Sequence, residues 1–565
     1  MENETKQKPV FDSPNDAANW LAEIAMKRLS CGKNLLEASL YDGSPLWWAA
    51  HTELALYISG QLVDVEKRQK RHFAPEAAMW ALELADQLGT TAIAKTIVAL
   101  QFLKGKSAGN RKKVLFFTYE KGWRGIPDPK TGKMVEGDIH YRAVMDELLD
   151  CGYGVEVATV APLWRIGFWT SANEALKRAL MQKPLHLPLE NFWDFGVYSR
   201  QKKAGAGFSA AWKEINSDEE FWKSFNAGGK DFREETRRMS EFFFVSHFRK
   251  VAKAVELFSR LIEREKPCVL VAPNHGGWYW KALLIAAKAK GVKVLSTQHA
   301  GITDDILSYF NYPPLTGKKL GVQLPDAFAA QGIWTCRLFE KTWGYPKSML
   351  KVTGQPRYDF IPAAKKSFDR ESCLKGMGIS PEKKVVLFAT QLAVPPFVDD
   401  ERLIFRALAK IQRSSGIGII VKPHPRGKAE DYEKIAKEEG ADAVVIGENS
   451  VFHEAVLASD LVISLPSTII TEALMLCRPA MLVDFGEGNH KLPWVESGVA
   501  IPISEKDGIE KNIGLALFDG ATRKRLDRAR EKFVLEHCFL QDGKAAKRVA
   551  VLIMEMIEGN RQNWK

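Results

Sequence analysis

The stretch from Val421 to Phe485 constrains the fold more than any other part of the chain. Short apolar runs alternate there with segments of helical length, and polar residues follow the runs, as in VKPHPRG, LVISLPST and AMLVDF. Strands that alternate with helices of about 10–15 residues are typical of a parallel sheet with helical crossovers. Ligands of such sheets bind beyond the carboxyl ends of the strands. The stretch therefore predicts a ligand site made of the residues that follow its strands.

The same alternation is found in an earlier part of the chain, so we expect an α/β protein with two doubly wound, Rossmann-like domains that face each other across a cleft. The strands are predicted at 114–118, 155–159, 269–272, 292–297, 326–330, 351–353, 385–389, 418–421, 443–446 and 461–464. The predicted units are a helical N-terminal region at 1–110, a first domain at 111–360 with a helical insertion at about 160–245, a linker at 361–382, and a second domain with a helical tail at 383–565. The N-terminal helices are expected either to form a bundle or to dock onto the first domain.

The composition indicates a soluble globular protein, because 46% of the residues are hydrophobic and 26% are charged. No segment approaches the roughly 20 apolar residues of a membrane-spanning helix, and the first residues do not resemble a signal peptide. Seven cysteines without a CxxC pair argue against a disulfide framework. We therefore expect a cytoplasmic protein, with peripheral contact at the inner face of the cell membrane left open.

The net charge of +11 predicts an anionic partner. A nucleotide or phosphorylated substrate, an anionic membrane surface and a nucleic acid all fit that charge. No zinc-finger spacing, RNA-recognition signature or basic zipper accompanies the basic runs, so no nucleic acid is expected as a partner.

The first candidate site is the KPHP sequence at 422–425, which follows the strand predicted at 418–421. Prolines exclude a helix there and favour an extended backbone at the residues that precede them. The imidazole of His424 is therefore expected at the rim of the sheet, where it can bind a phosphate oxygen. Lys422 and Arg426 add positive charge. The alternative is a buried structural turn.

The second candidate is the hydroxyl-rich turn with Ser464, Ser467 and Thr468, which leads into a helix. Hydroxyl groups and free backbone N–H groups at a helix start suit a phosphate, although ordinary helix capping is the alternative. Glu472 follows Thr468 by one turn and shares its face. Its carboxylate can accept two hydroxyl groups of a ribose or another sugar, with a surface glutamate as the alternative. The turn and Glu472 predict a site for an activated donor.

Three residues of the first domain are candidates for a general base that deprotonates an acceptor hydroxyl. His275 in NHGG and His299 in QHAG follow predicted strands, and Asp304 comes shortly after them. Small residues after each histidine leave room for a ligand. Glu120 and Asp128 are weaker candidates, and a structural role at a strand end is the alternative for each.

The TGQPRYD sequence at 353–359 follows another predicted strand, and its Gly354 and Arg357 are added to the donor site. No HExxH or DxD sequence stands at the predicted rim, so no metal ion is expected. No cofactor is expected either.

Taken together, QHAG, TGQPRYD, FATQ at 388–391, KPHP, SLPST and TEAL at 471–474 resemble a GT-B-fold transferase. The chain is similar over about residues 265–555 to enzymes of surface-polysaccharide assembly. These are the CDP-glycerol glycerophosphotransferases, capsule Kdo transferases and bacterial polysialyltransferases, while UDP-N-acetylglucosamine 2-epimerases share the fold more distantly. The resemblance implies that His424 and the serine and threonine hydroxyls hold the donor's phosphates, with Glu472 near its ribose or sugar.

The function that the resemblance implies is transfer of a sugar or a polyol phosphate from a nucleotide-activated donor to a cell-surface glycan or lipid-linked acceptor. The donor, linked to CMP, CDP or UDP, is itself a substrate and not a cofactor. One alternative is a nucleotide-sugar 2-epimerase or hydrolase on the same fold, which would release nucleotide without an acceptor. The other is a non-catalytic scaffold that binds a nucleotide or polysaccharide and forms no product.

Overall fold

The computed structural model of the protein describes most of the chain between Val10 and Gly559. The described residues are 10–60, 76–103, 112–118, 122–163, 168–180, 184–391, 397–424, 427–447, 452–485, 493–504 and 508–559. Within these ranges, no helix is both long enough and apolar enough to cross a membrane.

The first domain is built on a parallel sheet of seven strands in the order β13-β12-β11-β10-β3-β6-β7. The strands are β3 (Lys112–Phe117), β6 (Val155–Ala161), β7 (Leu185–Pro188), β10 (Val269–Ala272), β11 (Lys293–Thr297), β12 (Ala327–Ala330) and β13 (Leu350–Val352). Six of these strands lie within two residues of the predicted positions. Helices cover the sheet on both sides, which is why its central strands consist almost entirely of apolar residues.

The two faces of the sheet can be followed along β3, where successive side chains point in opposite directions. Phe116 packs on Tyr141 just before α6 (Arg142–Asp150), in a cluster that includes α22 (Ala545–Glu558). Phe117 contacts Phe258 of α11 (Phe248–Glu265) and Trp280 of α12 (Gly277–Lys290) on the other face. Helix α13 (Ile333–Trp343) follows β12.

The insertion expected at about 160–245 is not wholly helical, because it contributes the edge strand β7. The sequence of β7, Leu-His-Leu-Pro, is short and ends in a proline, a residue that sheets accept mainly at an edge. The remaining elements are α7 (Phe168–Leu180), α8 (Phe195–Asn216), α9 (Glu219–Trp222), the hairpin of β8 (Asn226–Ala227) and β9 (Lys230–Asp231), and α10 (Arg233–Phe242).

The second domain contains a parallel sheet of six strands in the order β16-β15-β14-β17-β18-β19. The strands are β14 (Val385–Ala389), β15 (Gly418–Lys422), β16 (Val444–Val445), β17 (Leu461–Ser464), β18 (Ala480–Val483) and β19 (Ala500–Ile503). The helices are α16 (Phe397–Ser415), α17 (Ala429–Glu438), α18 (Phe452–Ala458), α19 (Ile469–Met475), α20 (Ile509–Phe518) and α21 (Gly520–His537). Strand β19 was not predicted from the sequence. The α/β prediction with two parallel, doubly wound sheets is confirmed.

The segment predicted to be a linker, 361–382, belongs to the second domain. It forms α14 (Ile361–Ser367) and α15 (Arg370–Gly376), whose apolar side chains join the core under the sheet. Arg370 donates a hydrogen bond to Asp460 at 3.0 Å. The few apolar residues among many charged ones concealed these helices in the sequence.

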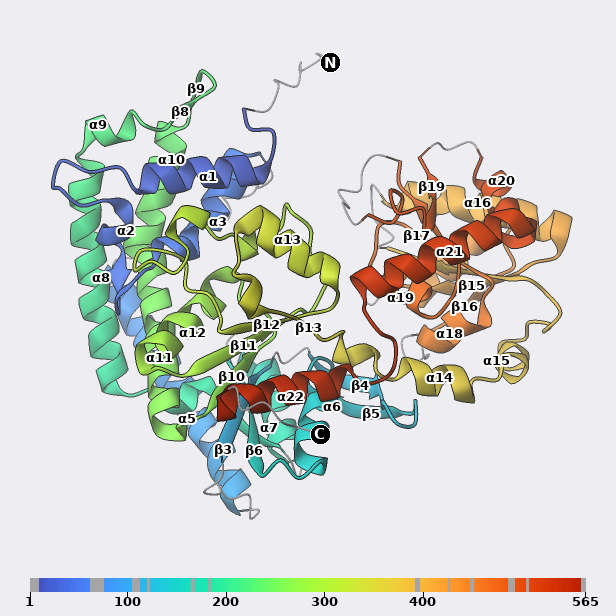
Figure 1. Ribbon diagram of the computed structural model, residues 1–565, viewed down its shortest axis with the longest axis horizontal. Helices are drawn as coiled ribbons and strands as arrows, with labels where there is room; N and C mark the ends of the chain where they lie inside the picture. Colours follow the sequence, from blue (N-terminus) through green and yellow to red (C-terminus); the bar gives the residue numbers. More distant parts are fainter. Residues whose placement is uncertain are drawn as a thin grey trace.

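The C-terminal helix α22 does not belong to the second domain as the sequence suggested. It packs beside α6 on the first sheet, whereas α21 stays on the second domain (Figure 1). Both carboxylate oxygens of Asp359 accept backbone N–H groups at the start of α22, from Ala545 at 2.9 Å and Ala546 at 2.7 Å. The chain therefore crosses between the domains twice.

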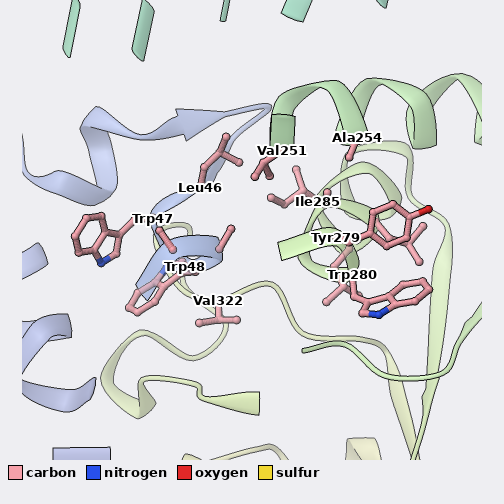
Figure 2. Close-up of a cluster of buried hydrophobic side chains, with 14 of the residues drawn as sticks. Leu46, Trp47, Trp48, Val251, Ala254, Tyr279, Trp280, Ile285 and Val322 are labelled. Carbon is pink, nitrogen blue, oxygen red and sulfur yellow. The ribbon is translucent and has the colours of Figure 1, made fainter. Parts of the chain in front are cut away.

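The N-terminal region docks onto the first domain. Its elements are α1 (Pro14–Ala25), α2 (Leu35–Ala38), the hairpin of β1 (Leu40–Tyr41) and β2 (Ser44–Pro45), α3 (Trp47–Ile58) and α5 (Glu76–Leu103). Figure 2 shows Trp47 and Trp48 in one buried cluster with Tyr279 and Trp280 of α12. Trp48 donates through Nε1 to the carbonyl of Leu320 at 2.9 Å. Of the two arrangements expected, docking is the one found.

Candidate functional site

A cavity of about 790 Å³ lies between the two domains. Its first-domain wall includes the hairpin of β4 (Trp123–Pro127) and β5 (Met134–Asp138), which lies between α6 and α14 in Figure 1. Its second-domain wall is made of residues that follow β14 and β15, together with parts of α18 and α19. The polar side chains that line it are Arg124, Asp138, His140, Arg142, Arg357, Tyr358, Thr390, Lys422, His424, Lys428, Glu430, His453, Ser467 and Glu472. The size is that of a small-molecule site.

The KPHP sequence is at the end of β15, and both Lys422 and His424 line this cavity. The backbone N–H of His424 donates to Oγ1 of Thr390 at 3.2 Å, which joins the strand ends of β14 and β15. Nζ of Lys422 donates to the carbonyl of Gly447 at 3.1 Å. Arg426 lies outside the described residues. A cationic wall of this kind suits the phosphates of a nucleotide.

The three hydroxyl groups predicted to act together are separated by the structure. Ser467 lines the large cavity, whereas Thr468 lines a smaller hollow of about 80 Å³ beside His299. The hydroxyl of Ser464 is fully buried and donates to the carbonyl of Ala389 at 3.1 Å. Ser464 therefore joins β17 to β14 and does not face the cavity, contrary to the role predicted for it.

Glu472 is held by two residues of the TGQPRYD sequence. Arg357 forms an ion pair with its Oε1, and the hydroxyl of Tyr358 donates to the same oxygen at 3.0 Å. The guanidinium of Arg357 lies 4.5 Å from the centre of the Tyr358 ring. Burial raises the pKa of Tyr358 well above its usual value, so its hydroxyl remains a donor. Arg357 and Tyr358 line both the large cavity and the small hollow.

His299 lies where the small hollow meets a third one, of about 390 Å³, lined by Asn274, Gly277 and Trp278. Its ring hydrogen-bonds to the carbonyl of Pro273, while Nδ1 has no hydrogen-bond partner among the described residues. The carbonyl can only accept, so the proton is on the other ring nitrogen and Nδ1 carries a lone pair. Burial, with a smaller contribution from Arg357, lowers the pKa of His299. The neutral ring can therefore accept a proton.

The other two candidates for the base are placed away from the interdomain cavity. His275 is buried and hydrogen-bonded at both ring nitrogens, to Ser296 at 2.8 Å and Tyr345 at 2.9 Å. Burial lowers its pKa to about 3. Asp304 is exposed on the surface, where its carbonyl accepts a hydrogen bond from Asn15 of α1. The hydrogen bonds of His275 indicate a structural role, and the exposed carboxylate of Asp304 does not line the cavity. Of the two weaker candidates, Asp128 does not line the cavity either, and Glu120 lies outside the described residues.

Gly354 does not line the large cavity either. Its φ of +78° is one that residues with a side chain rarely adopt. A Cβ atom there would lie 3.2 Å from the Cβ of Ala545 and from Nη2 of Arg548 on α22. The glycine therefore permits the return of α22 to the first domain.

Two residues of this site were missed in the sequence, Asp138 and His140. Both line the large cavity, and the ring of His140 lies 5.9 Å from that of His299 at nearly a right angle. Burial raises the pKa of Asp138 to about 6 and lowers that of His140 to about 3. The only local signal was a polar DIH sequence, and no strand was predicted for the hairpin that carries it. Among the described residues, no group of three or more His, Cys, Asp or Glu is placed to hold a metal ion.

Residues 280–485 match the family model of CDP-glycerol:poly(glycerophosphate) glycerophosphotransferase. The matched segment contains His299, Arg357, His424 and Glu472. This match confirms the resemblance expected from the sequence. No curated protein matches the chain.

Three solved structures are among those similar to the chain. A putative UDP-N-acetylglucosamine 2-epimerase from Listeria monocytogenes is 14% identical with a TM-score of 0.47, covering 80% of this chain and 99% of its own. The wall teichoic acid polymerase TagF is 12% identical with a TM-score of 0.45, covering 85% and 99%. A glycosyltransferase from Rickettsia africae is 11% identical with a TM-score of 0.42, covering 80% and 100%. Similarities of this size carry no argument about function.

Proposed function

We propose that this protein, whose residues 280–485 match the glycerophosphotransferase family model, transfers a polyol phosphate from a CDP-linked donor to a hydroxyl group of a cell-surface polymer. The observation that carries the proposal is the position of His299. His299 lines both the small hollow and the hollow beside α12, and its buried Nδ1 has no hydrogen-bond partner among the described residues. Arg357 lines both the small hollow and the cationic interdomain cavity.

The donor binds in the large cavity. Lys422, His424 and Ser467 contact its phosphates, and Glu472 accepts hydroxyl groups of its ribose. Arg357 and Tyr358 hold Glu472 through Oε1, so the carboxylate is oriented before the donor arrives. Fixing the orientation of a binding group in advance strengthens binding, because less freedom is lost when the ligand arrives.

The acceptor approaches His299 through the hollow beside α12. Nδ1 takes the proton of the acceptor hydroxyl as its oxygen attacks the phosphorus atom that carries the polyol. The new phosphorus–oxygen bond forms, the bond to the CMP oxygen breaks, and CMP leaves with the electron pair of that bond. Cationic side chains of the donor wall offset the charge on the departing phosphate. The proposed reaction uses neither a metal ion nor a cofactor.

A lipid-linked acceptor would place the enzyme at a membrane surface. The ends of α5 and α7 carry exposed apolar residues, among them Leu103 at 83%, Phe102 at 49% and Leu180 at 47% exposure. Exposed apolar side chains are typical of surfaces that lie on a membrane, and the protein as a whole carries a net charge of +11, which favours an anionic membrane surface. We propose this end of the first domain as the part of the protein that contacts the membrane.

The proposal is tested by measuring CMP release and polymer extension with purified protein, CDP-glycerol and a short poly(glycerol phosphate) oligomer. We expect release that depends on the oligomer. His299→Ala should reduce turnover by about a hundredfold or more while CDP-glycerol still binds, because general-base catalysis contributes about 10²–10⁴-fold. His424→Ala should instead weaken donor binding.

Two controls make the outcome unambiguous. His275→Gln tests the other strand-end histidine, and its main effect should be on stability, since His275 is packed in the core. CMP-, UDP- and GDP-linked sugars replace CDP-glycerol in parallel assays. Transfer from a sugar nucleotide alone would contradict the polyol-phosphate assignment, and CMP release without the oligomer would favour a hydrolase. Full activity of His299→Ala would refute the assigned base.

A further inference from the structure

Asp138 is a buried carboxyl group that the proposed reaction does not use. Its relative exposure is 0%, and it lines the interdomain cavity at the end of β5. Oδ1 accepts the backbone N–H groups of His140 at 2.9 Å and Tyr141 at 3.0 Å, which fixes the turn before α6. Oδ2 has no hydrogen-bond partner among the described residues. A buried oxygen without a partner is costly, so it requires an explanation such as a missing ligand.

The turn that carries Asp138 is attached to the loop that carries His299. The hydroxyl of Tyr141 hydrogen-bonds to Oγ1 of Thr297 at 3.1 Å, two residues before His299. His140 extends from the same turn to the ring of His299. Asp138 Oδ2, His140 Nδ1 and His299 Nδ1 are all buried side-chain atoms without a partner. Three side chains near the cleft therefore each carry one buried polar atom that has no hydrogen-bond partner among the described residues.

A glycine, Gly122, lies next to Oδ2. A Cβ atom on Gly122 would lie 3.1 Å from Oδ2 and 3.9 Å from Cγ of Asp138. Any side chain at position 122 would therefore cover the free oxygen. Gly122 does not have a positive φ, so its backbone conformation does not by itself require glycine.

The charges around Asp138 restrict which chemical group can bind to its Oδ2. Burial raises the pKa of Asp138 to about 6, so near neutral pH the carboxyl is mostly ionised and Oδ2 accepts hydrogen bonds. A phosphate offers no proton and would be repelled by the carboxylate. An ammonium group would be repelled by Arg178 and Arg124, whose charges act on Asp138, and by Arg142 and Arg357, which line the same cavity. A hydroxyl group is neutral and supplies the donor that Oδ2 lacks.

We propose that Asp138 is a specificity-determining residue that binds a hydroxyl group of a polyol or sugar through Oδ2, next to the hydroxyl or phosphorus centre that reacts. The proposal rests on the transferase function above. The polyhydroxy group has two sources, the transferred part of the donor and the end of the acceptor, and the chemistry is the same for both.

The variant Asp138→Asn separates ligand binding by Oδ2 from the structural role of Oδ1 in the turn. Asparagine keeps an oxygen for the amides of His140 and Tyr141 but replaces the accepting Oδ2 by an NH₂ group. The matched control is Asp128→Asn, at the other end of the same hairpin. Oδ1 of Asp128 accepts the amides of Lys130 at 3.0 Å and Thr131 at 2.9 Å, and Asp128 does not line the cavity.

Calorimetric titration with CDP-glycerol and with CDP, using the full chain, measures donor binding, and transfer to the poly(glycerol phosphate) oligomer measures the acceptor KM. We expect Asp138→Asn to raise either the Kd of CDP-glycerol or the acceptor KM by about tenfold, the usual effect of leaving a buried group unpaired. The Kd of CDP, which lacks the polyol, should not change. A higher Kd of CDP-glycerol identifies the donor's polyol as the ligand of Asp138. A higher acceptor KM identifies the end of the acceptor as that ligand.

A second variant, Gly122→Ala, covers Oδ2 without altering the charge or the turn, and it should reproduce the same loss. The proposal is overturned by one result, provided that the wild-type protein binds and transfers the donor. That result is a Kd of CDP-glycerol and an acceptor KM that are the same in Asp138→Asn, Gly122→Ala, the control Asp128→Asn and the wild type. If the wild-type protein neither binds nor transfers any nucleotide-linked donor, the proposed function fails instead, so the two failures are distinguishable.

Discussion

At the scale of single residues, the site depends on which way a side chain points at the end of a strand. Ser464 and Ser467 are three positions apart, yet one hydroxyl is buried against β14 and the other lines the cavity. His275 and His299 also follow neighbouring strands, and only His299 has a ring nitrogen without a partner. Equivalent positions in the sequence thus have different chemistry in the structure.

A pair of hydroxyl deletions tests this difference. Tyr358→Phe removes one of the hydrogen bonds that orient Glu472, and should raise the donor KM about fivefold, since such a bond contributes about 1 kcal/mol. Ser464→Ala removes a hydroxyl that does not face the cavity, and should lower stability by about 1 kcal/mol at an unchanged KM. Steady-state kinetics and chemical unfolding measure the two effects. Equal KM values for Tyr358→Phe and wild type would show that Glu472 needs no such support.

At the scale of elements, the first domain is completed by segments that come from elsewhere in the chain. Helix α22 covers one face of its sheet, and α3 packs against α12 on the other. Lys281 of α12 is buried and donates to the carbonyl of Trp48 at 2.5 Å. The N-terminal region is therefore part of the packing that positions α12 and the loop before it.

Trp48→Ala tests that dependence. The side chain is 3% exposed, and its removal should lower the free energy of unfolding by about 3–5 kcal/mol, as expected for a large buried aromatic residue. Leu103→Ala, at a position 83% exposed, is the control and should change stability by less than about 0.5 kcal/mol. Denaturant unfolding measures both. A small effect of Trp48→Ala would mean that the N-terminal region is only loosely attached.

At the scale of the whole molecule, buried titratable groups control how stability depends on pH. Burial lowers the pKa of six histidines to about 3 or 4: His51, His140, His247, His275, His453 and His537. It raises the pKa of Asp138 and Asp359 to about 6 and that of Glu401 to about 8. The two sets of groups act in opposite directions.

In the unfolded chain these histidines bind protons below about pH 6.5, whereas in the folded protein they remain neutral. The histidines therefore make the free energy of unfolding fall as the pH falls from about 6.5 toward 4. The three carboxyls hold protons in the folded state and make stability fall as the pH rises from about 4 to 6, and for Glu401 to about 8. The histidines are more numerous, so we expect a lower Tm at about pH 5 than at about pH 6.5. Thermal unfolding across this range tests it, and a constant or higher Tm at pH 5 would contradict it.

The alternation of apolar runs with helical segments determined both parallel sheets, because a buried strand and its covering helix have different periods that remain visible in the sequence. The position of KPHP at the end of β15 followed from its prolines in the same way. The short strands β7 and β19 and the helices α14 and α15 were missed because their few apolar residues form no clear period.

Only the tertiary structure decided how these pieces form a site. Asp138 and His140 come from a hairpin with little local signal, and α22 returns to a domain that the chain had left nearly two hundred residues earlier. The ion pair of Arg357 with Glu472 joins positions 115 residues apart. Local periodicity encodes which face of an element is buried. It does not encode which distant segment covers that face, and that choice leaves Nδ1 of His299 and Oδ2 of Asp138 without partners at the cleft.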